Sequence, residues 1–293
     1  MVLEPSLATR AAATDLIGDV LRARRPFDTT FAGHHSIATM SARDRAFVYN
    51  LAITTLRRLG TIDHVVKSCL QRPLPRRAQQ VRDILRVGSC QLLFMQVAAH
   101  GAVATCVELT RQLGHSAHIK LVNAILRRLA RDGTKIISNL DEARVNTPEW
   151  LWETWSAVYG KDVCRQIAAA HLIGAPLDIS TTGDPKTWAA ELGGDVLFAN
   201  TIRLTGRGQV TELPGFQDGQ WWVQDAAAGL IANLAGDVTS KSVIDLCAAP
   251  GGKTSQFLTR GARVTAVDWS AARLERMGKN MERLGFAPRM IQA

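Results

Sequence analysis

The chain has 293 residues, of which 46% are hydrophobic and 21% are charged, a composition typical of a soluble globular protein long enough for two domains. Its net charge of +9 is unevenly distributed: residues 1–135 contain 20 Lys and Arg against 9 Asp and Glu, and the remaining residues contain 15 against 17. This distribution favours binding of a polyanion by the first half, although a solvated helical surface in a basic proteome would give the same counts.

The five cysteines are scattered and form no Cys-x-x-Cys pair, which argues against a zinc site and against a disulfide framework. We therefore expect no metal, and free thiols in apolar segments favour the cytoplasm. The first ten residues, MVLEPSLATR, include Glu4 and lack an apolar core, so we expect no secretory signal. Residues 87–107 carry no formal charge, but their polar side chains favour two buried helices with a turn near Gly101 over a membrane span.

The region up to residue 137 is predicted to be all helical. Apolar residues recur at helical spacing in segments 41–60 and 119–131, and two further apolar faces lie in 81–85 and 103–110. Ser41 is predicted to cap the first of these helices, Gly60 to end it, and Gly133 to end the last. Because no strand-like alternation competes, these apolar stripes are expected to form the core of a helical bundle.

The next region mixes a helix with short strands. Residues 147–149, Thr-Pro-Glu, predict a helix start, since proline is favoured at the first helical position, and Pro176 closes the helical region. Strands are then expected at 177–180, 196–198 and 202–204, separated by turn-forming residues that include Gly206 and Gly208.

From Ser240 onward the pattern becomes strand, helix, strand, helix. Val243–Cys247 is a short apolar run suited to a buried parallel strand, and Arg263–Val267 forms a second strand that ends at Asp268. Ser270 is predicted to cap the following helix, and residues 289–291 begin a third strand. This order predicts a parallel sheet with right-handed crossovers.

The turn after the first of these strands is the candidate site. Gly251 and Gly252 can adopt backbone conformations closed to other residues, and small residues let a ligand approach the backbone. Asp268 stands 16 residues after Gly252, at the strand end where a carboxylate can accept the hydroxyls of a ribose. A phosphate-binding loop does not fit, because Cys247 holds the place of its first glycine, and the dinucleotide fingerprint is absent. What remains is a nucleoside such as S-adenosylmethionine, or a purely structural glycine turn.

The run DLCAAPGGKT at residues 245–254 resembles the cofactor-binding motif of RNA cytosine-C5 methyltransferases. Residues 213–216, LPGF, and 223–227, VQDAA, resemble the lead-in of the same family. The helical region is similar to a NusB-like RNA-binding domain, chiefly in residues 44–48, 85–94 and 122–129. Together these segments resemble the Fmu/RsmB-type methyltransferases of 16S ribosomal RNA over nearly the whole chain.

The resemblance implies three regions. These are an all-α NusB-like helical domain (1–137), a small helical and α/β linker region (138–212), and an incomplete Rossmann-like (class I) S-adenosylmethionine methyltransferase domain (213–293). The implied partner is 16S ribosomal RNA, with no membrane and no metal. Arg273 is a further candidate for the cofactor pocket, with a surface position as the alternative. Carried over by position, the residues that would hold S-adenosyl-L-methionine are Cys247, Ala248, Ala249, Pro250, Gly251, Gly252, Lys253 and Asp268.

In this family a cysteine thiolate adds to carbon 6 of cytosine, which makes carbon 5 nucleophilic toward the methyl sulfonium. The resemblance puts that cysteine on later strands, beyond Ala293, so no catalytic residue is assigned and the 293-residue chain is expected to be inactive alone. Cys247 is interpreted as a small residue packed at a strand end. Two alternatives stay open: a non-catalytic RNA-binding adaptor with a vestigial cofactor domain, and a methyltransferase for another acceptor.

Overall fold

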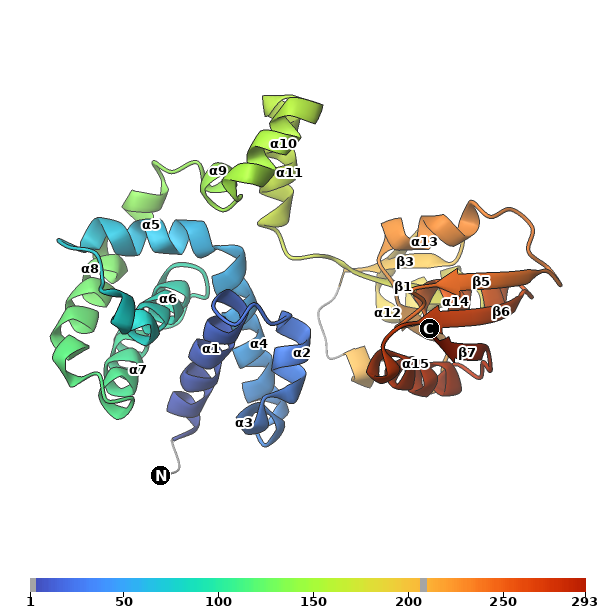
Figure 1. Cartoon of the computed structure of the whole chain (residues 1–293), viewed down its shortest axis with the longest axis horizontal. Coiled ribbons are helices and arrows are strands. Elements are labelled where there is room, and N and C mark those ends of the chain that lie inside the picture. Colours follow the sequence, from blue (N-terminus) through green and yellow to red (C-terminus); the bar gives the residue numbers. More distant parts are fainter. Residues whose placement is uncertain (1–3, 206–209) are drawn as a thin grey trace. The chain divides into compact units, whose positions relative to one another are not determined.

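The computed structural model describes residues 4–205 and 210–293, which form two compact units divided after Gly174. Figure 1 shows that the first unit is helical and that the second contains both sheets. The division places the predicted linker region, 138–212, partly in each unit. Gly206 and Gly208, predicted to lie in turns, are outside the described residues.

The helical unit consists of consecutive helices joined by short connections. They are α1 (Pro5–Leu21), α2 (Phe27–Gly33), α3 (His35–Ala38), α4 (Ala42–Arg57), α5 (Leu59–Cys69), α6 (Gln79–Leu93), α7 (Ala99–Gln112), α8 (Ile119–Ile137), α9 (Glu142–Val145), α10 (Glu149–Tyr159) and α11 (Lys161–His171). Ser41 caps α4 as predicted, because its Oγ accepts a hydrogen bond from the Asp44 N–H at 3.1 Å.

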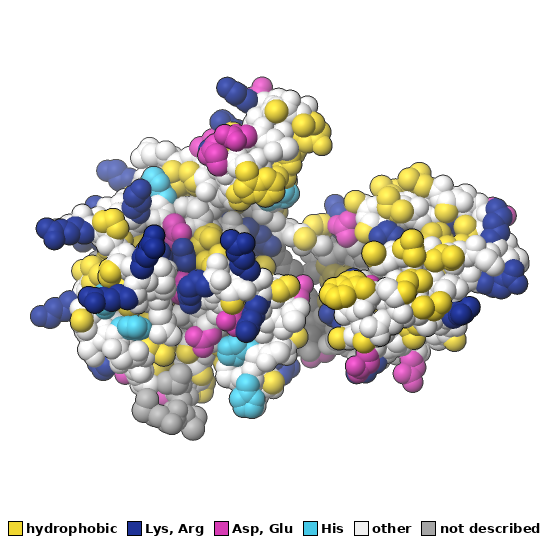
Figure 2. Space-filling view, viewed as in Figure 1, with side chains coloured by type: hydrophobic (Ala, Val, Ile, Leu, Met, Phe, Trp, Pro, Cys, Tyr) yellow, Lys and Arg dark blue, Asp and Glu magenta, His cyan; other side chains and the backbone are white. Residues whose placement is uncertain are grey.

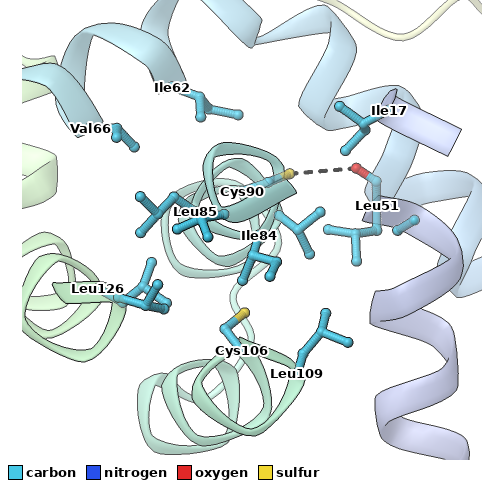
Figure 3. Packing of buried hydrophobic residues seen from close by; sticks show 14 of the residues in the cluster. Ile17, Leu51, Ile62, Val66, Ile84, Leu85, Cys90, Cys106, Leu109 and Leu126 are labelled. Carbon is cyan, nitrogen blue, oxygen red and sulfur yellow. Dashed lines mark hydrogen bonds between the residues drawn. The ribbon is translucent and has the colours of Figure 1, made fainter. Parts of the chain in front are cut away.

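The predicted apolar stripes, in α4, α6, α7 and α8, meet in one buried core as expected, and α1 and α5 contribute to the same core. Figure 3 shows Leu51, Ile84, Leu85, Cys90 and Leu126 within this cluster, where side chains from separate helices point toward one another. The Cys90 thiol donates to the Leu51 carbonyl across 3.8 Å. Residues 87–107 form the end of α6, the connection after it and the start of α7. No helix in the described part of the chain is long and apolar enough to cross a membrane.

Three predicted helix boundaries are wrong. Gly60 lies inside α5, where a Cβ would stand 1.8 Å from the Val145 carbonyl oxygen, and Gly133 lies inside α8, where a Cβ would stand 2.5 Å from Leu93. Both glycines therefore allow close packing instead of ending a helix. Gly101 is in the first turn of α7, and the connection between α6 and α7 lies earlier, at residues 94–98.

The helices after residue 137 are tied to the helical core by polar contacts. Arg58 Nη1 donates to Glu142 Oε2 at 2.9 Å, and the Thr61 hydroxyl donates to the same oxygen at 3.1 Å. The Asn146 amide donates to the Thr61 hydroxyl at 2.7 Å. These bonds join α9 to the start of α5 and make residues 138–174 part of the helical unit.

The second unit contains one antiparallel sheet and one parallel sheet. Its elements are β1 (Leu177–Thr181), α12 (Pro185–Leu192), β2 (Gly194–Phe198), β3 (Thr201–Leu204), β4 (Trp221–Val223), α13 (Ala226–Asn233), β5 (Ser242–Leu246), α14 (Gly252–Thr259), β6 (Arg263–Asp268), α15 (Ala271–Arg283) and β7 (Arg289–Gln292). The strands β1 to β3 agree with the predicted ones. Strand β4 and helices α12 and α13 are elements that the sequence analysis did not predict.

The first sheet has the order β2-β3-β1-β4, and each neighbouring pair is antiparallel. Its core is built around Ile179, Ile202 and Trp221, which are fully buried. Because β4 pairs with β1 in the register Ile179↔Val223, the segment after β4 is positioned by this sheet.

The second sheet has the order β5-β6-β7 and is parallel, as predicted. Val264 and Ala266 are buried on the face that α14 and α15 contact. On the opposite face Ile244 and Leu246 are 67% and 70% exposed, so within the described residues this face is open. Figure 2 shows hydrophobic side chains gathered over the second unit.

One arginine links β4 of the first sheet to α15, the helix that packs on the second sheet. Arg283, at the end of α15, donates to the backbone carbonyls of Phe216 and Trp221, and its guanidinium lies 4.1 Å from the centre of the Phe216 ring. Burial lowers the pKa of this guanidinium. The contacts hold β4 beside α15, which places the residues after β4 next to the parallel sheet.

Candidate functional site

The loop between β5 and α14 has an unusual backbone course. Cys247 and Gly251 both have a positive φ, 61° and 104° respectively, and the Ala249–Pro250 peptide bond is cis. A Cβ on Gly251 would stand 2.7 Å from Met281 Cε, so the end of that side chain would have to shift, and the positive φ by itself disfavours any residue but glycine. The loop therefore packs Gly251 against α15 and buries Ala248 and Ala249 beside it, while Cys247 and Pro250 remain exposed.

Asp268 lies behind this loop and holds it. Its Oδ2 accepts a hydrogen bond from the Ala249 N–H at 3.2 Å, and its Oδ1 accepts one from the Ser270 N–H at 3.1 Å. The carboxylate has no exposed surface. The structure thus brings the predicted loop and the predicted carboxylate together, with the carboxylate bonded to the loop backbone.

Arg273 covers the same carboxylate. Its Nη1 lies 3.2 Å from Asp268 Oδ2, and its Nη2 donates to the Ala249 carbonyl. The guanidinium therefore bridges the strand end and the loop, while its side chain remains 47% exposed.

A cavity of about 440 Å³ lies in front of the loop. Of the predicted site residues, Cys247, Ala248, Ala249, Pro250, Gly252 and Lys253 line it. Gly251 and Asp268 do not line it, since Gly251 faces α15 and the Asp268 carboxylate lies behind the loop. A role for Asp268 toward a ribose stays a prediction.

Several lining residues were not predicted as site residues. They come from β4 and the two residues after it, from α13, from β5 and from α15, and are Trp222, Val223, Gln224, Asp225, Ala228, Asp245, Leu246 and Asn280. The segment 223–227 carries a family resemblance, which is the signal that points to it. The cavity thus places two carboxylates, of Asp225 and Asp245, near the ammonium-bearing side chain of Lys253.

Gln224 links the cavity wall to the rest of the unit through a buried network. Its Oε1 accepts hydrogen bonds from the Ser180 hydroxyl at 3.0 Å and from the Trp222 Nε1–H at 2.9 Å. Its Nε2 donates to Gln256 Oε1 at 2.7 Å, and Gln256 in turn donates to the Gly229 carbonyl at 3.0 Å. Every polar atom of the Gln224 amide has a partner, which makes this wall rigid.

Asp178 positions the helix on the other side of the cavity. Its carboxylate accepts hydrogen bonds from Arg203 Nε at 2.8 Å and Nη2 at 2.9 Å, and from the Ala226 N–H at 3.0 Å. These bonds, chiefly those from Arg203, lower the pKa of Asp178. Asp225 caps the same helix, α13, by accepting from the Ala228 N–H at 3.1 Å.

The cysteines differ sharply in their surroundings. Cys90, Cys106 and Cys164 are buried, as expected of core residues, and Cys69 is half-buried. Burial raises the pKa of Cys90 to about 11 and that of Cys106 to about 12. Cys247 is exposed, so the interpretation of this residue as packed at the strand end is wrong: its positive φ turns it out of the strand.

Two family descriptions match this chain. The NusB family matches residues 7–131, and the family described as 16S rRNA methyltransferase RsmB/F matches residues 234–293. The first match lies within the helical unit, and the second covers β5 to β7 together with the cavity loop.

Relatives match across both regions. Ribosomal RNA small subunit methyltransferase B of Xylella fastidiosa (strain Temecula1) is 31% identical over 304 residues, covering 99% of this chain and 69% of the relative. The chain belongs to the family of ribosomal RNA small subunit methyltransferase B. The proteins of that name from Xanthomonas campestris and Escherichia coli O157:H7 are 34% and 31% identical, and the matches cover 82% and 84% of this chain.

The chain spans 57% to 69% of the length of these three methyltransferase B proteins. Among solved structures, that of PH0851 aligns with the whole chain with a TM-score of 0.68 at 17% identity, covering 70% of that protein. This likeness supports the fold alone: a helical region followed by a region that contains the sheets. In the described residues, no group of three or more His, Cys, Asp or Glu side chains is placed to hold a metal ion.

Proposed function

We propose that this chain binds S-adenosyl-L-methionine in the cavity beside the loop 247–253, as the cofactor-binding part of an enzyme that methylates carbon 5 of a cytosine in 16S ribosomal RNA. The observation that carries the proposal is the composition of the cavity wall. It combines a loop with small side chains, one ammonium group and two carboxylates. These groups complement a ligand that carries a carboxylate, an ammonium and a sulfonium.

Each charged group has a defined part in this proposal. Lys253 would bind the carboxylate of the methionine moiety, while Asp245 and Asp225 would attract its cationic centres. Asp245 is oriented for this role by the Thr254 hydroxyl, which donates to its Oδ2 at 2.6 Å. Asp268 would keep the loop in shape through the Ala249 N–H and reach the ribose once Arg273 turns away. When bound, the cofactor supplies an electrophilic methyl group.

The carbon-5 specificity and the RNA substrate rest on the family resemblance. A thiolate must attack carbon 6 of the base, and within the described residues Cys247 is the thiol that lines the cavity. Its place in the cofactor loop does not suit attack on a base that lies beyond the methyl group. We therefore expect this polypeptide to bind cofactor without transferring methyl groups. A substrate in the small ribosomal subunit places the proposed activity in the cytoplasm.

The absence of transfer is checked with a tritiated-methyl assay on ribosomal RNA. No incorporation above a boiled control is expected, and steady turnover by this chain alone contradicts the expectation. If turnover occurs, Cys247→Ser decides whether that thiol is the nucleophile.

Cofactor binding is tested with S-adenosylhomocysteine as the probe, by calorimetry on the full chain. Lys253→Ala is expected to raise the Kd about tenfold, because one charge-assisted hydrogen bond is lost. Lys241→Ala is the matched control, since Lys241 is exposed and lies outside the cavity. Equal affinities of the two variants would refute the proposed role of Lys253.

A further inference from the structure

The helical unit contains a groove that the proposed cofactor site does not use. It lies between the loop that joins α5 to α6 and the first half of α8, and its volume is about 700 Å³. Its walls are mostly apolar and include Leu70, Pro73, Leu74, Leu121 and Ile125. Leu74 is buried and anchors the loop, and the neighbouring prolines restrict its backbone. The groove is therefore preformed.

Cationic side chains surround this groove. Arg72 and Arg128 line it, and Arg76 and Arg77 follow directly on the loop. All four are exposed, and no hydrogen bond or ion pair within the described residues engages Arg72, Arg76 or Arg77. No carboxylate is among the lining residues. Figure 2 shows Lys and Arg side chains gathered along this edge of the helical unit, where Figure 1 places α8.

These free arginines contrast with the arginines that stabilise the fold. Arg86 donates two hydrogen bonds of 2.7 Å to Asp63 and another of 2.9 Å to the buried Asp83. Such pairing leaves little charge for an external ligand. Arg72, Arg76 and Arg77 have no such partner within the described residues, so the groove presents available positive charge beside an apolar surface.

We infer that this groove binds an unpaired nucleotide of single-stranded RNA, with its base between the apolar walls and the adjoining phosphates on Arg72, Arg76, Arg77 and Arg128. The inference rests on the proposed function, since it names where the RNA is held. Guanidinium planes and apolar walls stack on the faces of unpaired bases, and Gln71 and His118 supply polar groups for a base edge. A duplex hides its bases, so it would use the cations alone.

The test uses the full 293-residue chain and fluorescence anisotropy with two RNA probes. One is a single-stranded oligonucleotide of about 12 nucleotides, and the other is a duplex of the same length. The double variant Arg72→Gln/Arg128→Gln is expected to raise the Kd for the single strand about tenfold. It should also reduce the slope of log K against log salt by about 2.

The matched control for charge is Arg24→Gln/Arg43→Gln. Both residues are exposed and lie outside the groove: Arg24 is in the connection between α1 and α2, and Arg43 is in the first turn of α4. Since this variant loses the same net charge, its Kd is expected to change less than about twofold. If the control weakens binding as much as the groove variant does, general electrostatics explains the result and the inference is overturned.

A second variant fills the groove without changing charge. Ala124 lines the groove and is exposed, so Ala124→Trp leaves the core intact. It is expected to weaken single-strand binding about fivefold or more and to leave duplex binding unchanged. Unchanged single-strand binding in both groove variants overturns the inference while leaving RNA binding by the chain intact. Failure of the unaltered chain to bind either RNA overturns the proposed RNA substrate as well. Equal competition by poly-glutamate of matched charge overturns the inference in favour of an acidic protein partner.

Discussion

The Ala249 N–H donates a hydrogen bond to the Asp268 carboxylate at 3.2 Å, and Arg273 contacts both residues. The cofactor loop is therefore held from behind by the end of the neighbouring strand. In a parallel sheet the carboxyl ends of adjacent strands lie side by side, so this contact follows from the β5–β6 pairing. The loop shape and the position of the carboxylate are consequently coupled.

Removal of Arg273 should expose this coupling. Arg273→Ala leaves the buried Asp268 carboxylate without its cationic partner and is expected to lower the free energy of unfolding by about 2 kcal/mol. The measurement is urea denaturation followed by circular dichroism. Arg276→Ala is the control, because Arg276 is exposed on the same helix and has no ion pair in the described residues. Equal stability of the two variants would show that the bridge contributes nothing.

The glycine of the loop offers a second test. Gly251→Ala forces a side chain into a positive φ and against Met281, so a loss of about 3 kcal/mol is expected. Gly285→Ala is the comparison, since Gly285 has a φ of 72° but open space around it, and about 1 kcal/mol is expected there. Thermal unfolding of both variants measures the difference. If the two variants have the same melting temperature, the packing of the loop against α15 is not as described.

Thiol labelling separates Cys247 from the other cysteines. At pH 8 about one in a thousand Cys90 side chains is ionised, since its pKa is raised to about 11, and fewer still at Cys106. Because Cys69 is half-buried and lines the groove of the helical unit, the test uses a Cys69→Ser background. Labelling with a chromogenic disulfide should then show one fast thiol, which Cys247→Ser removes. Saturating S-adenosylhomocysteine is expected to slow this thiol because Cys247 lines the cavity. A fast phase that the ligand leaves unchanged would place the ligand elsewhere.

Asp178 gives the chain a stability that depends on pH. Because its pKa is lowered in the folded state, its contribution is complete above the unfolded value of about 4 and is lost as the pH falls through the folded value. Asp178→Asn should cost about 1.5 kcal/mol at pH 7, reduced because Arg203 is partly exposed. The deficit should shrink as the pH falls below 4.

The control for this pH series is Asp218→Asn, at an exposed carboxylate outside the ion pairs of the described residues. Urea unfolding at a series of pH values should give little difference between this variant and the unaltered chain. A deficit of Asp178→Asn that is constant across the series would contradict the role assigned to its charge.

The elements that could be predicted are those whose signal is local. The parallel strands β5 and β6 are apolar runs bounded by turn residues, and the Ser41 cap precedes an apolar stripe. Strand β4 has only three residues, and it is a strand because Val223 pairs with Ile179, far away in the sequence. Gly60 was misassigned for the same reason, since its role depends on Val145.

The residues of the candidate site also divide into those with a local sequence signal and those without one. The loop 247–253 is contiguous and carries its own motif, whereas Gln224 and Asn280 reach the cavity through strand pairing and helix packing. The periodicity of one segment does not show which distant segments pair or pack with it. The exposure of Cys247 was also not predicted. It follows from the positive φ of this residue, and an apolar run in the sequence gives no signal of that backbone conformation.

The central claim is that the cavity beside the loop 247–253 binds S-adenosyl-L-methionine. The most direct measurement is a titration of the full chain with S-adenosylhomocysteine, followed by backbone amide shifts in nuclear magnetic resonance. The account predicts saturable shifts at Ala248, Ala249, Gly252, Lys253 and Gln224, with the helical unit unaffected. Saturable shifts confined to other residues, or none at a ligand concentration that saturates other enzymes using this cofactor, would contradict it.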